Sequence, residues 1–169
     1  EMRLLLLITF STLFSLTAFS QCKYEKNEVD SFTGNKTIIT QAKGLKFGLL
    51  DGAAIKLARM NDSKKLLWFY FTTSDIFSVR SGDKLMFKLD NDEVVTLSNL
   101  SRVTADYIIT SGITSWSAKM TYELSPRVIS LLSTHDIQSF RLYTSKGYLE
   151  NDIKSKKKRS NLRSIIDCI

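Results

Sequence analysis

The chain has 169 residues, and its 24 Lys and Arg residues against 17 Asp and Glu residues give a net charge of +7. With a single histidine it cannot form a two-histidine metal site, and it contains no glycine-rich phosphate loop or dinucleotide-binding fingerprint. The sequence therefore predicts no cofactor and no bound metal.

Residues 1–20 are typical of a signal peptide. Arg3 is followed by an apolar run at 4–16, and the segment ends in the small-residue pattern Ala18-Phe19-Ser20. We expect cleavage to leave residues 21–169 as one domain of ordinary size in the periplasm or outside the cell. A retained membrane anchor is the alternative, although the apolar run is short and contains Ser and Thr. No later segment is apolar enough to span a membrane.

The only cysteines, Cys22 and Cys168, lie at the two ends of the expected mature chain. An exported protein meets an oxidising compartment, so we predict a disulfide bond between them. Closing so long a loop contributes about 5 kcal/mol in the chain-entropy model. One alternative is lipidation of Cys22, but Gln21 stands where lipoprotein signals carry Gly, Ala or Ser. The other alternative is two unpaired thiols.

The first predicted element is a hairpin of residues 24–30 and 36–42. Gly34 and Asn35, between these segments, supply the positive φ angles that a turn needs. Residues 53–60 are flanked by hairpin-type turns, so we expect them to form the next strand despite their Ala-rich composition.

Residues 66–71 are apolar at every position. Such a run is typical of a central strand that is buried on both faces, so we predict that Trp68 and Phe69 lie in the core. The alternative is an exposed aromatic stripe that binds sugars by stacking.

A second hairpin is predicted for residues 85–89 and 95–97, which alternate between apolar and polar side chains. The acidic turn at 90–93 joins the two strands. We expect Met86 and Lys88 to point outward, away from the core.

The longest predicted strand covers residues 113–124, where apolar and polar side chains alternate from Thr114 onward. Trp116 belongs to the face that should meet the core. Before this strand, residues 99–106 are predicted to form a polar loop and residues 107–110 a short strand.

A serine N-cap followed by a proline predicts a short helix near 126–133. A third hairpin, of residues 138–142 and 149–153, comes next. The chain closes with a helix near 155–168, in which apolar residues recur at helical spacing after a basic start. Together the elements predict an α+β fold, mainly antiparallel β, with sandwich- or barrel-like sheets.

Several short motifs resemble those of small exported proteins of Bacteroidetes-type bacteria, a set without an assigned function. The motifs are the leader junction Phe19-Ser20-Gln21-Cys22, the segments Tyr122-Glu123-Leu124, Phe140-Arg141-Leu142 and Gly147-Tyr148, and the late Cys168. The resemblance implies an exported domain and brings no catalytic residue with it.

The single histidine, His135, is the candidate for acid–base catalysis. Asp136 is adjacent, but neighbouring residues on a strand or turn point apart, and no Gly-x-Ser-x-Gly motif is present. We therefore predict that His135 lies at a helix end or in a turn, with a hydrolase as the alternative. Asp90, Asp92 and Glu93 are interpreted as a solvated turn, with calcium binding as the alternative.

Five basic residues cluster near the C-terminal end. They are Lys154, Lys156, Lys157, Lys158 and Arg159. We interpret them as the solvated face of the terminal helix, with contact to a polyanion or an anionic membrane surface as the alternative. Nucleic acid is not an expected partner, because the protein is predicted to be exported and no aromatic residue is interleaved in the run.

For function, the sequence favours a non-catalytic envelope or secreted module that binds a protein or a glycan. The competing hypotheses are a membrane-associated structural protein, using the basic helix or a lipidated Cys22, and a hydrolase using His135. No motif identifies the ligand or the partner.

Overall fold

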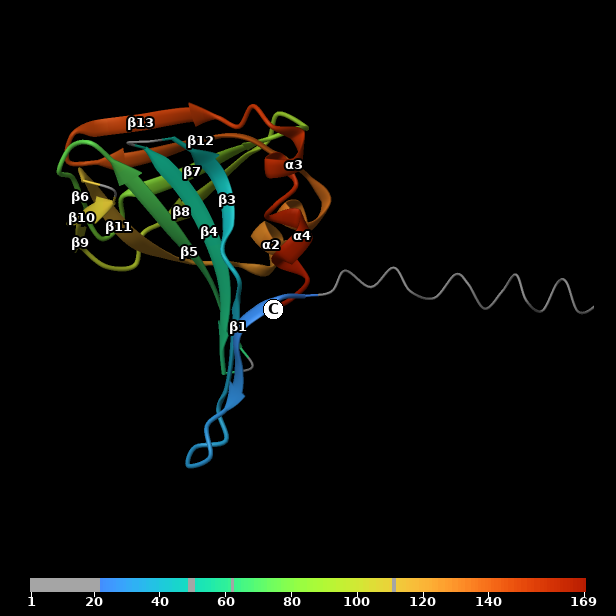
Figure 1. The fold of residues 1–169 in the computed structure, drawn as a ribbon. Coiled ribbons are helices and arrows are strands. Elements are labelled where there is room, and N and C mark those ends of the chain that lie inside the picture. The colour runs from blue at the N-terminus through green and yellow to red at the C-terminus, as the bar shows by residue number, and fades with distance from the viewer. Residues whose placement is uncertain (1–21, 49–50, 62, 111) are drawn as a thin grey trace, which may run out of the picture.

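The computed structural model describes residues 22–48, 51–61, 63–110 and 112–169, so the predicted signal peptide lies outside the described residues. Two antiparallel sheets face each other, and the helices lie together at one side of the domain (Figure 1). The predicted α+β fold with mainly antiparallel sheets is confirmed.

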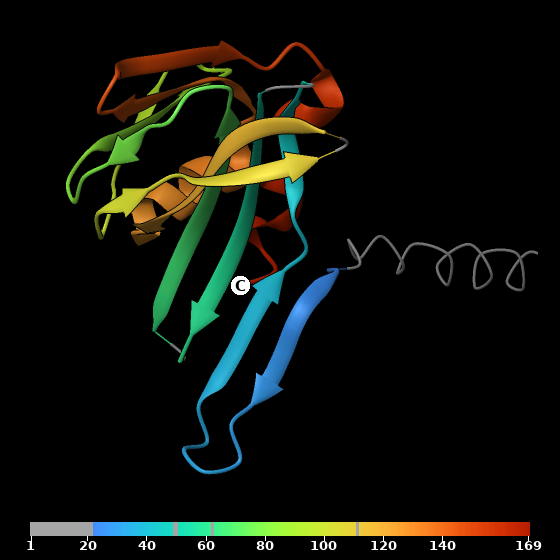
Figure 2. The same cartoon turned by 60° about the vertical axis from the view of Figure 1, so that its left-hand side comes forward.

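The larger sheet has seven strands, in the order β1-β2-β4-β5-β11-β10, with β3 as a second partner of β4. Its strands are β1 (Tyr24–Val29), β2 (Lys36–Thr40), β3 (Lys43–Phe47), β4 (Gly52–Met60), β5 (Lys64–Thr73), β10 (Asp106–Thr110) and β11 (Ile113–Glu123). The sheet curls, and the β1–β2 hairpin projects from the body of the domain (Figure 2). The first predicted hairpin is therefore present, and its tip stands away from the core.

The smaller sheet has four strands in the order β13-β12-β7-β8. They are β7 (Lys84–Leu89), β8 (Val94–Ser98), β12 (Ile137–Thr144) and β13 (Gly147–Asp152), which confirm the second and third predicted hairpins. Two further short strands, β6 (Ser78–Val79) and β9 (Val103–Thr104), pair with each other and form a small two-stranded sheet. β9 falls inside the segment that the sequence predicts as a loop.

The three helices in the described ranges are short. α2 (Pro126–Thr134) matches the predicted helix, and the Ser125 side chain accepts a hydrogen bond of 3.3 Å from the Val128 amide at its start. The predicted C-terminal helix is present as two pieces, α3 (Lys156–Arg159) and α4 (Arg163–Ile166). α3 lies against β3, and α4 lies against α2 (Figure 1).

Phenylalanine side chains from both sheets meet in the centre of the core. The ring centroid of Phe69 lies 5.2 Å from that of Phe140 and 6.3 Å from that of Phe87. Phe71 also contacts Phe140, at 6.3 Å. All three contacts are edge-to-face, the geometry that aromatic quadrupoles favour, so these rings join the two sheets.

Over residues 66–71, strand β5 is fully buried on its inner face but, apart from Leu66, only half-buried on its outer face, which corrects the prediction for this segment. Phe69 is fully buried as expected, whereas Trp68 and Tyr70 are half-buried on the outer face of the larger sheet. Lys119 lies 4.6 Å above the Trp68 ring, and Lys56 lies 5.4 Å from the centre of the Tyr70 ring. Neighbouring lysine stems thus shield the outward aromatic side chains.

A disulfide bond joins Cys22 and Cys168, whose Cα atoms are 5.7 Å apart. This bond confirms the predicted pair and occupies the Cys22 sulfur, so lipidation of that sulfur is incompatible with the structure. Next to the bond, the Tyr24 hydroxyl donates a hydrogen bond of 3.4 Å to the Cys168 carbonyl. On the other side, Ile165 and Ile166 of α4 are buried in the core.

Candidate functional site

Among the groups of polar side chains in the described part of the chain, three are candidates for a ligand site: those around His135, those near the C-terminal lysines, and those on the outer face of the smaller sheet. Each place can be judged by which groups it leaves available to a ligand. Within the described ranges, no cluster of three or more His, Cys, Asp or Glu side chains could hold a metal ion. No helix in the same ranges has the length and hydrophobicity needed to cross a membrane.

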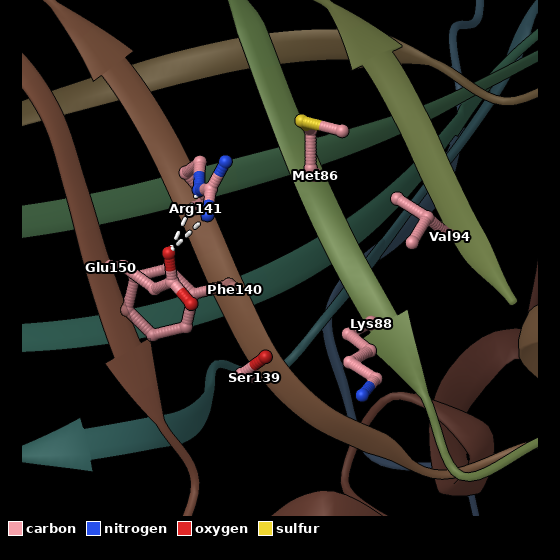
Figure 3. A pocket seen from close by; sticks show the side chains of 7 residues that line it. All are labelled: Met86, Lys88, Val94, Ser139, Phe140, Arg141 and Glu150. Carbon is pink, nitrogen blue, oxygen red and sulfur yellow. Dashed lines mark hydrogen bonds and ion pairs between the residues drawn. The ribbon is translucent and has the colours of Figure 1, made fainter. Parts of the chain in front are cut away.

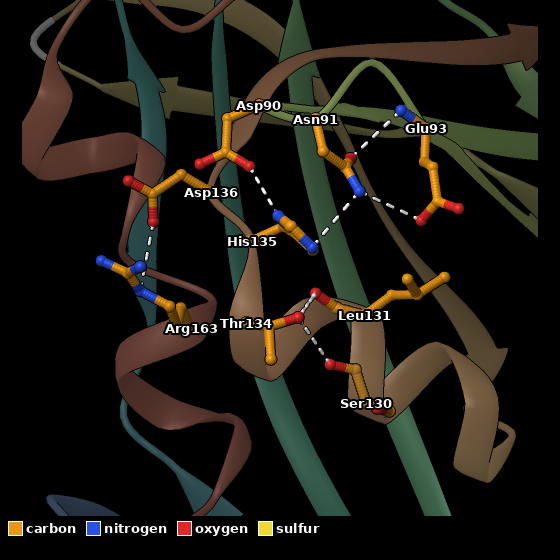
Figure 4. Close-up of polar contacts among 9 residues, drawn as sticks. All are labelled: Asp90, Asn91, Glu93, Ser130, Leu131, Thr134, His135, Asp136 and Arg163. Carbon is orange, nitrogen blue, oxygen red and sulfur yellow. Dashed lines mark hydrogen bonds and ion pairs between the residues drawn. The ribbon is translucent and has the colours of Figure 1, made fainter.

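His135 ends α2, as the sequence predicts, and both of its ring nitrogens have partners (Figure 4). Nδ1 lies 2.9 Å from Oδ1 of Asp90, and Nε2 lies 3.2 Å from the amide nitrogen of Asn91. Because the Asn91 amide donates to Nε2, the neutral ring carries its proton on Nδ1 and donates it to Asp90. This hydrogen bond is the main reason why the pKa of Asp90 lies below its ordinary value.

His135 and Asp90 are arranged like the histidine and aspartate of a catalytic triad, but the side-chain amide of Asn91 stands where the triad has its nucleophile. A nucleophile has to lie within hydrogen-bond reach of the free imidazole nitrogen, and Asn91 takes that position. The nearby hydroxyl of Thr134 donates to the Ser130 carbonyl at 3.0 Å, and Asp136 pairs with Arg163 at 3.2 Å (Figure 4). The geometry therefore supports a structural link between α2 and the β7–β8 turn, rather than hydrolysis.

The five basic residues of the C-terminal end do not form one uniform surface. Lys154, Lys156 and Lys157 are exposed, whereas Arg159 donates from Nε to the Ile153 carbonyl at 2.6 Å and is half-buried. Lys158 is half-buried as well and takes part in interactions of its own. Contact with a polyanion or a membrane surface stays the untested alternative for this run, and Lys154, Lys156 and Lys157 are its exposed members.

A hollow of about 300 Å³ beside these lysines combines both signs of charge. Its lining residues are Leu45, Lys46, Asp152, Lys154, Ser155 and Lys158. Lys46 is already bonded to Asp51 and to the Asn151 side chain. The hollow consequently offers an anion less positive charge than its three lysines suggest.

The outer face of the smaller sheet is the third place, and its side chains lie in rows across the strands. Arg141 on β12 is paired with Met86 on β7 and with Glu150 on β13. Two residue pairs further along, and so on the same face, Tyr143 lies opposite Tyr148. Side chains that face each other across an antiparallel pair are close enough to interact, so the register creates these neighbours.

Arg141 is the centre of this surface. Its guanidinium donates to Glu150 from Nε at 2.8 Å and from Nη2 at 2.5 Å, and it lies 4.6 Å from the centre of the Tyr148 ring. Hydrogen bonds to Glu150, and then to Tyr143, raise the pKa of Arg141, so the side chain is always charged. Its position is fixed by partners on two strands before any ligand arrives.

Next to Arg141 the sheet surface is hollowed by about 160 Å³ (Figure 3). The lining residues are Met86, Lys88, Val94, Ser139, Phe140, Arg141 and Glu150. Val94 is 52% exposed and Tyr148 is 58% exposed, so apolar surface lies on both sides of the charged pair. This hollow, together with Tyr143 and Tyr148, is called the sheet-face site below.

Only part of the sheet-face site was expected from the sequence. The outward direction of Met86 and Lys88 was predicted, whereas Arg141, Tyr148 and Glu150 were not identified as neighbours. Counting outward from the turn between Thr144 and Gly147 would have found them, because that turn sets the register in which they meet.

Comparison of this chain with protein-family models, with curated proteins and with solved structures finds no match. The class of protein is therefore defined by the fold and the site alone. It is a mainly antiparallel β domain of two sheets, closed by a disulfide bond between its ends, with a polar and aromatic hollow on the smaller sheet.

Proposed function

We propose that the protein is an exported, non-catalytic module that binds a glycan through the sheet-face site. The observation that carries this proposal is the arrangement of Tyr148, Arg141 and Glu150, in which an exposed ring lies against a fixed pair of opposite charges. The predicted signal peptide and the disulfide bond support an exported location, since disulfides persist in oxidising compartments.

The chemistry of the site suits a sugar. A sugar ring has an apolar face, which an aromatic side chain covers, and a rim of hydroxyl groups, which needs donors and acceptors in one plane. Tyr148 provides the aromatic surface, Arg141 the donors and Glu150 the acceptors. Because the three side chains already hold each other in place, binding costs little additional side-chain entropy.

The size of the hollow points to a long ligand. Pockets for complete small molecules usually measure about 300 to 1,000 Å³, whereas this hollow measures about 160 Å³ and is open to solvent. It can take a single ring, and the rest of the ligand must extend over the exposed rows of the sheet. A polysaccharide chain fits this description better than an isolated monosaccharide.

The same residues argue against hydrolysis of the bound sugar. Glycosidases need two carboxyl groups on either side of the scissile bond. Among the residues described at the hollow, Glu150 is the one carboxylate, and Arg141 pairs with it. The pair can orient hydroxyl groups, but it cannot supply both an acid and a base.

The proposal can be tested on a microarray of bacterial and host polysaccharides, followed by calorimetry with the best ligand. We expect Tyr148→Ala and Arg141→Ala each to weaken binding at least about tenfold, the loss that follows when a central aromatic or arginine anchor is truncated. Phe32→Ala is the matched control, because Phe32 is an aromatic side chain, 95% exposed, at the far hairpin.

Circular dichroism should show that all three variants keep the wild-type fold. Binding that survives Tyr148→Ala and Arg141→Ala unchanged would contradict the proposed site. Failure to bind any polysaccharide on the array would count against a glycan ligand altogether.

A further inference from the structure

Strand β10 forms one edge of the larger sheet and is unusually apolar for an edge. Within the described part of the chain it pairs with β11 alone. Tyr107, Ile108 and Ile109 follow each other on this strand and are 65%, 40% and 65% exposed. Exposed edges usually carry lysine, proline or a bulge that prevents pairing with another chain. β10 has the sequence DYIIT and an unbroken register with β11, so it has none of these devices.

The opposite edge of the same sheet is protected in the usual way. Strand β1 carries the exposed charged residues Glu25, Lys26 and Glu28, and its register with β2 shifts after Tyr24. Charges and irregular register both discourage the addition of a further strand. The β1 edge is therefore protected against pairing, whereas the β10 edge is open to it.

The register of β10 determines which backbone groups are available. Thr110 pairs with Ile113 across a two-residue connection, and Ile108 pairs with Ser115. In an antiparallel ladder, hydrogen-bonded and non-hydrogen-bonded pairs alternate, and the pair that closes a two-residue hairpin is hydrogen-bonded. The amide and carbonyl groups of Tyr107 and Ile109 consequently face away from β11, toward the free edge.

We propose that β10 pairs with β10 of a second copy of this chain, antiparallel, about a two-fold axis at Ile108. In this register Ile108 lies opposite Ile108 of the partner subunit, and Tyr107 lies opposite Ile109 of the partner subunit. The two outward-facing residues on each strand then form about four hydrogen bonds across the axis. The larger sheet of one subunit and the larger sheet of its partner then form one continuous sheet across the contact.

The side chains of β10 are complementary to themselves in this arrangement. Each Tyr107 meets an isoleucine, and aromatic with β-branched is one of the favourable cross-strand pairs. Asp106 lies opposite Thr110 of the partner subunit, so the one charge on the strand does not face its own copy. Tyr107 is also held in place, because its ring contacts that of Trp116 edge-on at 6.2 Å. A two-fold contact of this kind closes on itself and forms a dimer, not a filament.

A cysteine placed on the proposed axis tests both the contact and its register. Across a non-hydrogen-bonded pair the Cα atoms lie about 4.5 Å apart, within the range that a disulfide bond spans. Ile108→Cys should therefore cross-link into a covalent dimer under mild oxidation, while Cys22 and Cys168 stay bonded to each other. Ile109→Cys is the matched control, because it faces Tyr107 of the partner subunit and should cross-link poorly. Non-reducing electrophoresis measures both.

Light scattering after size exclusion gives the second readout. We expect the wild-type chain to have twice its monomer mass and Ile109→Lys to be a folded monomer. Val29→Lys should stay dimeric, because Val29 is 62% exposed but lies on the protected edge. A monomeric wild-type protein, a dimer that persists in Ile109→Lys, or equal cross-linking of both cysteine variants would overturn the proposal.

Discussion

Cys22 and Cys168 are bonded to each other across a sequence separation of 146 residues. This bond holds the first strand of the larger sheet against the last turn of the chain, where Cys168 is 93% buried by its surroundings and Ile169 lies in the core. The ends of the domain are thus anchored at one point, and several properties of the protein depend on it.

The first prediction concerns the stability that this bond provides. Replacing both residues, in Cys22→Ala/Cys168→Ala, should lower the free energy of unfolding by about 2 to 5 kcal/mol, because the unfolded chain regains the entropy of an open loop. Urea denaturation measures the change, and wild-type protein unfolded in reductant should show the same loss. A change below about 1 kcal/mol would mean that the bond does not restrict the unfolded chain.

The second prediction compares two neighbouring aromatic residues on β5. Phe69→Ala should cost about 3 to 5 kcal/mol, because the ring is fully buried against Phe87 and Phe140. Trp68→Ala should cost less than about 2 kcal/mol, because that ring is half-buried under Lys119. Urea unfolding curves of the two variants, measured beside wild type, compare the two losses in the free energy of unfolding. Equal losses would contradict the one-sided burial of the strand.

The third prediction is a pH dependence at Asp90. Folding lowers the pKa of this carboxyl below 3.8, first through the hydrogen bond from His135. A carboxyl of this kind stabilises the fold above its unfolded pKa, and the contribution is lost as the pH falls through the lower, folded pKa. Asp90→Asn should therefore be less stable than wild type near neutral pH, and the difference should shrink below about pH 3.8.

Thermal unfolding across this pH range measures the difference. Asp75→Asn, at an exposed position, is the control and should match wild type throughout. A difference between Asp90→Asn and wild type that persists unchanged in acid would show that the Asp90 carboxylate does not act through its charge.

The fourth prediction concerns Asn99, which is 2% exposed and connects three segments of backbone. Its amide nitrogen donates to the carbonyls of Arg80, at 3.1 Å, and Ser101, and its oxygen accepts from the Thr121 amide at 3.2 Å. Asn99→Leu would leave these buried groups without partners, so we expect a loss of roughly 3 kcal/mol. Asn91→Leu, in the exposed β7–β8 turn, should cost clearly less, and chemical denaturation compares the two variants.

Local patterns were sufficient for most of the fold. The alternation in residues 113–124, the turn residues of the three hairpins and the capped helix near 126–133 each depend on neighbours in sequence, and all were predicted correctly. The fully apolar run at 66–71 was also recognised as a strand. Its outer face was misjudged, because nothing local shows that lysines from β4 and β11 will cover Trp68 and Tyr70.

Features that depend on distant contacts were missed. Strand β3 was not predicted, and it forms by pairing with β4. Asn99 was assigned to a polar loop, although its side chain bonds to Arg80 and to Thr121 of β11, both distant in sequence. The terminal helix is interrupted between Arg159 and Arg163, where Asn161 donates its amide to the Gly44 carbonyl at 2.6 Å, a bond that no helical pattern predicts. The sheet-face site likewise depends on the pairing of three strands.

The exposed tip of the β1–β2 hairpin gives the joined ends a further consequence. This tip, with Phe32 95% exposed, is the kind of loop that proteases cut first. A cut there would leave the segment that contains Cys22 covalently attached to Cys168, so the nicked protein would gain only the mass of one water, and its two pieces would separate only when a reductant is added. The disulfide bond thus closes the chain into a covalent loop, and a single backbone cut between Cys22 and Cys168 does not release a fragment.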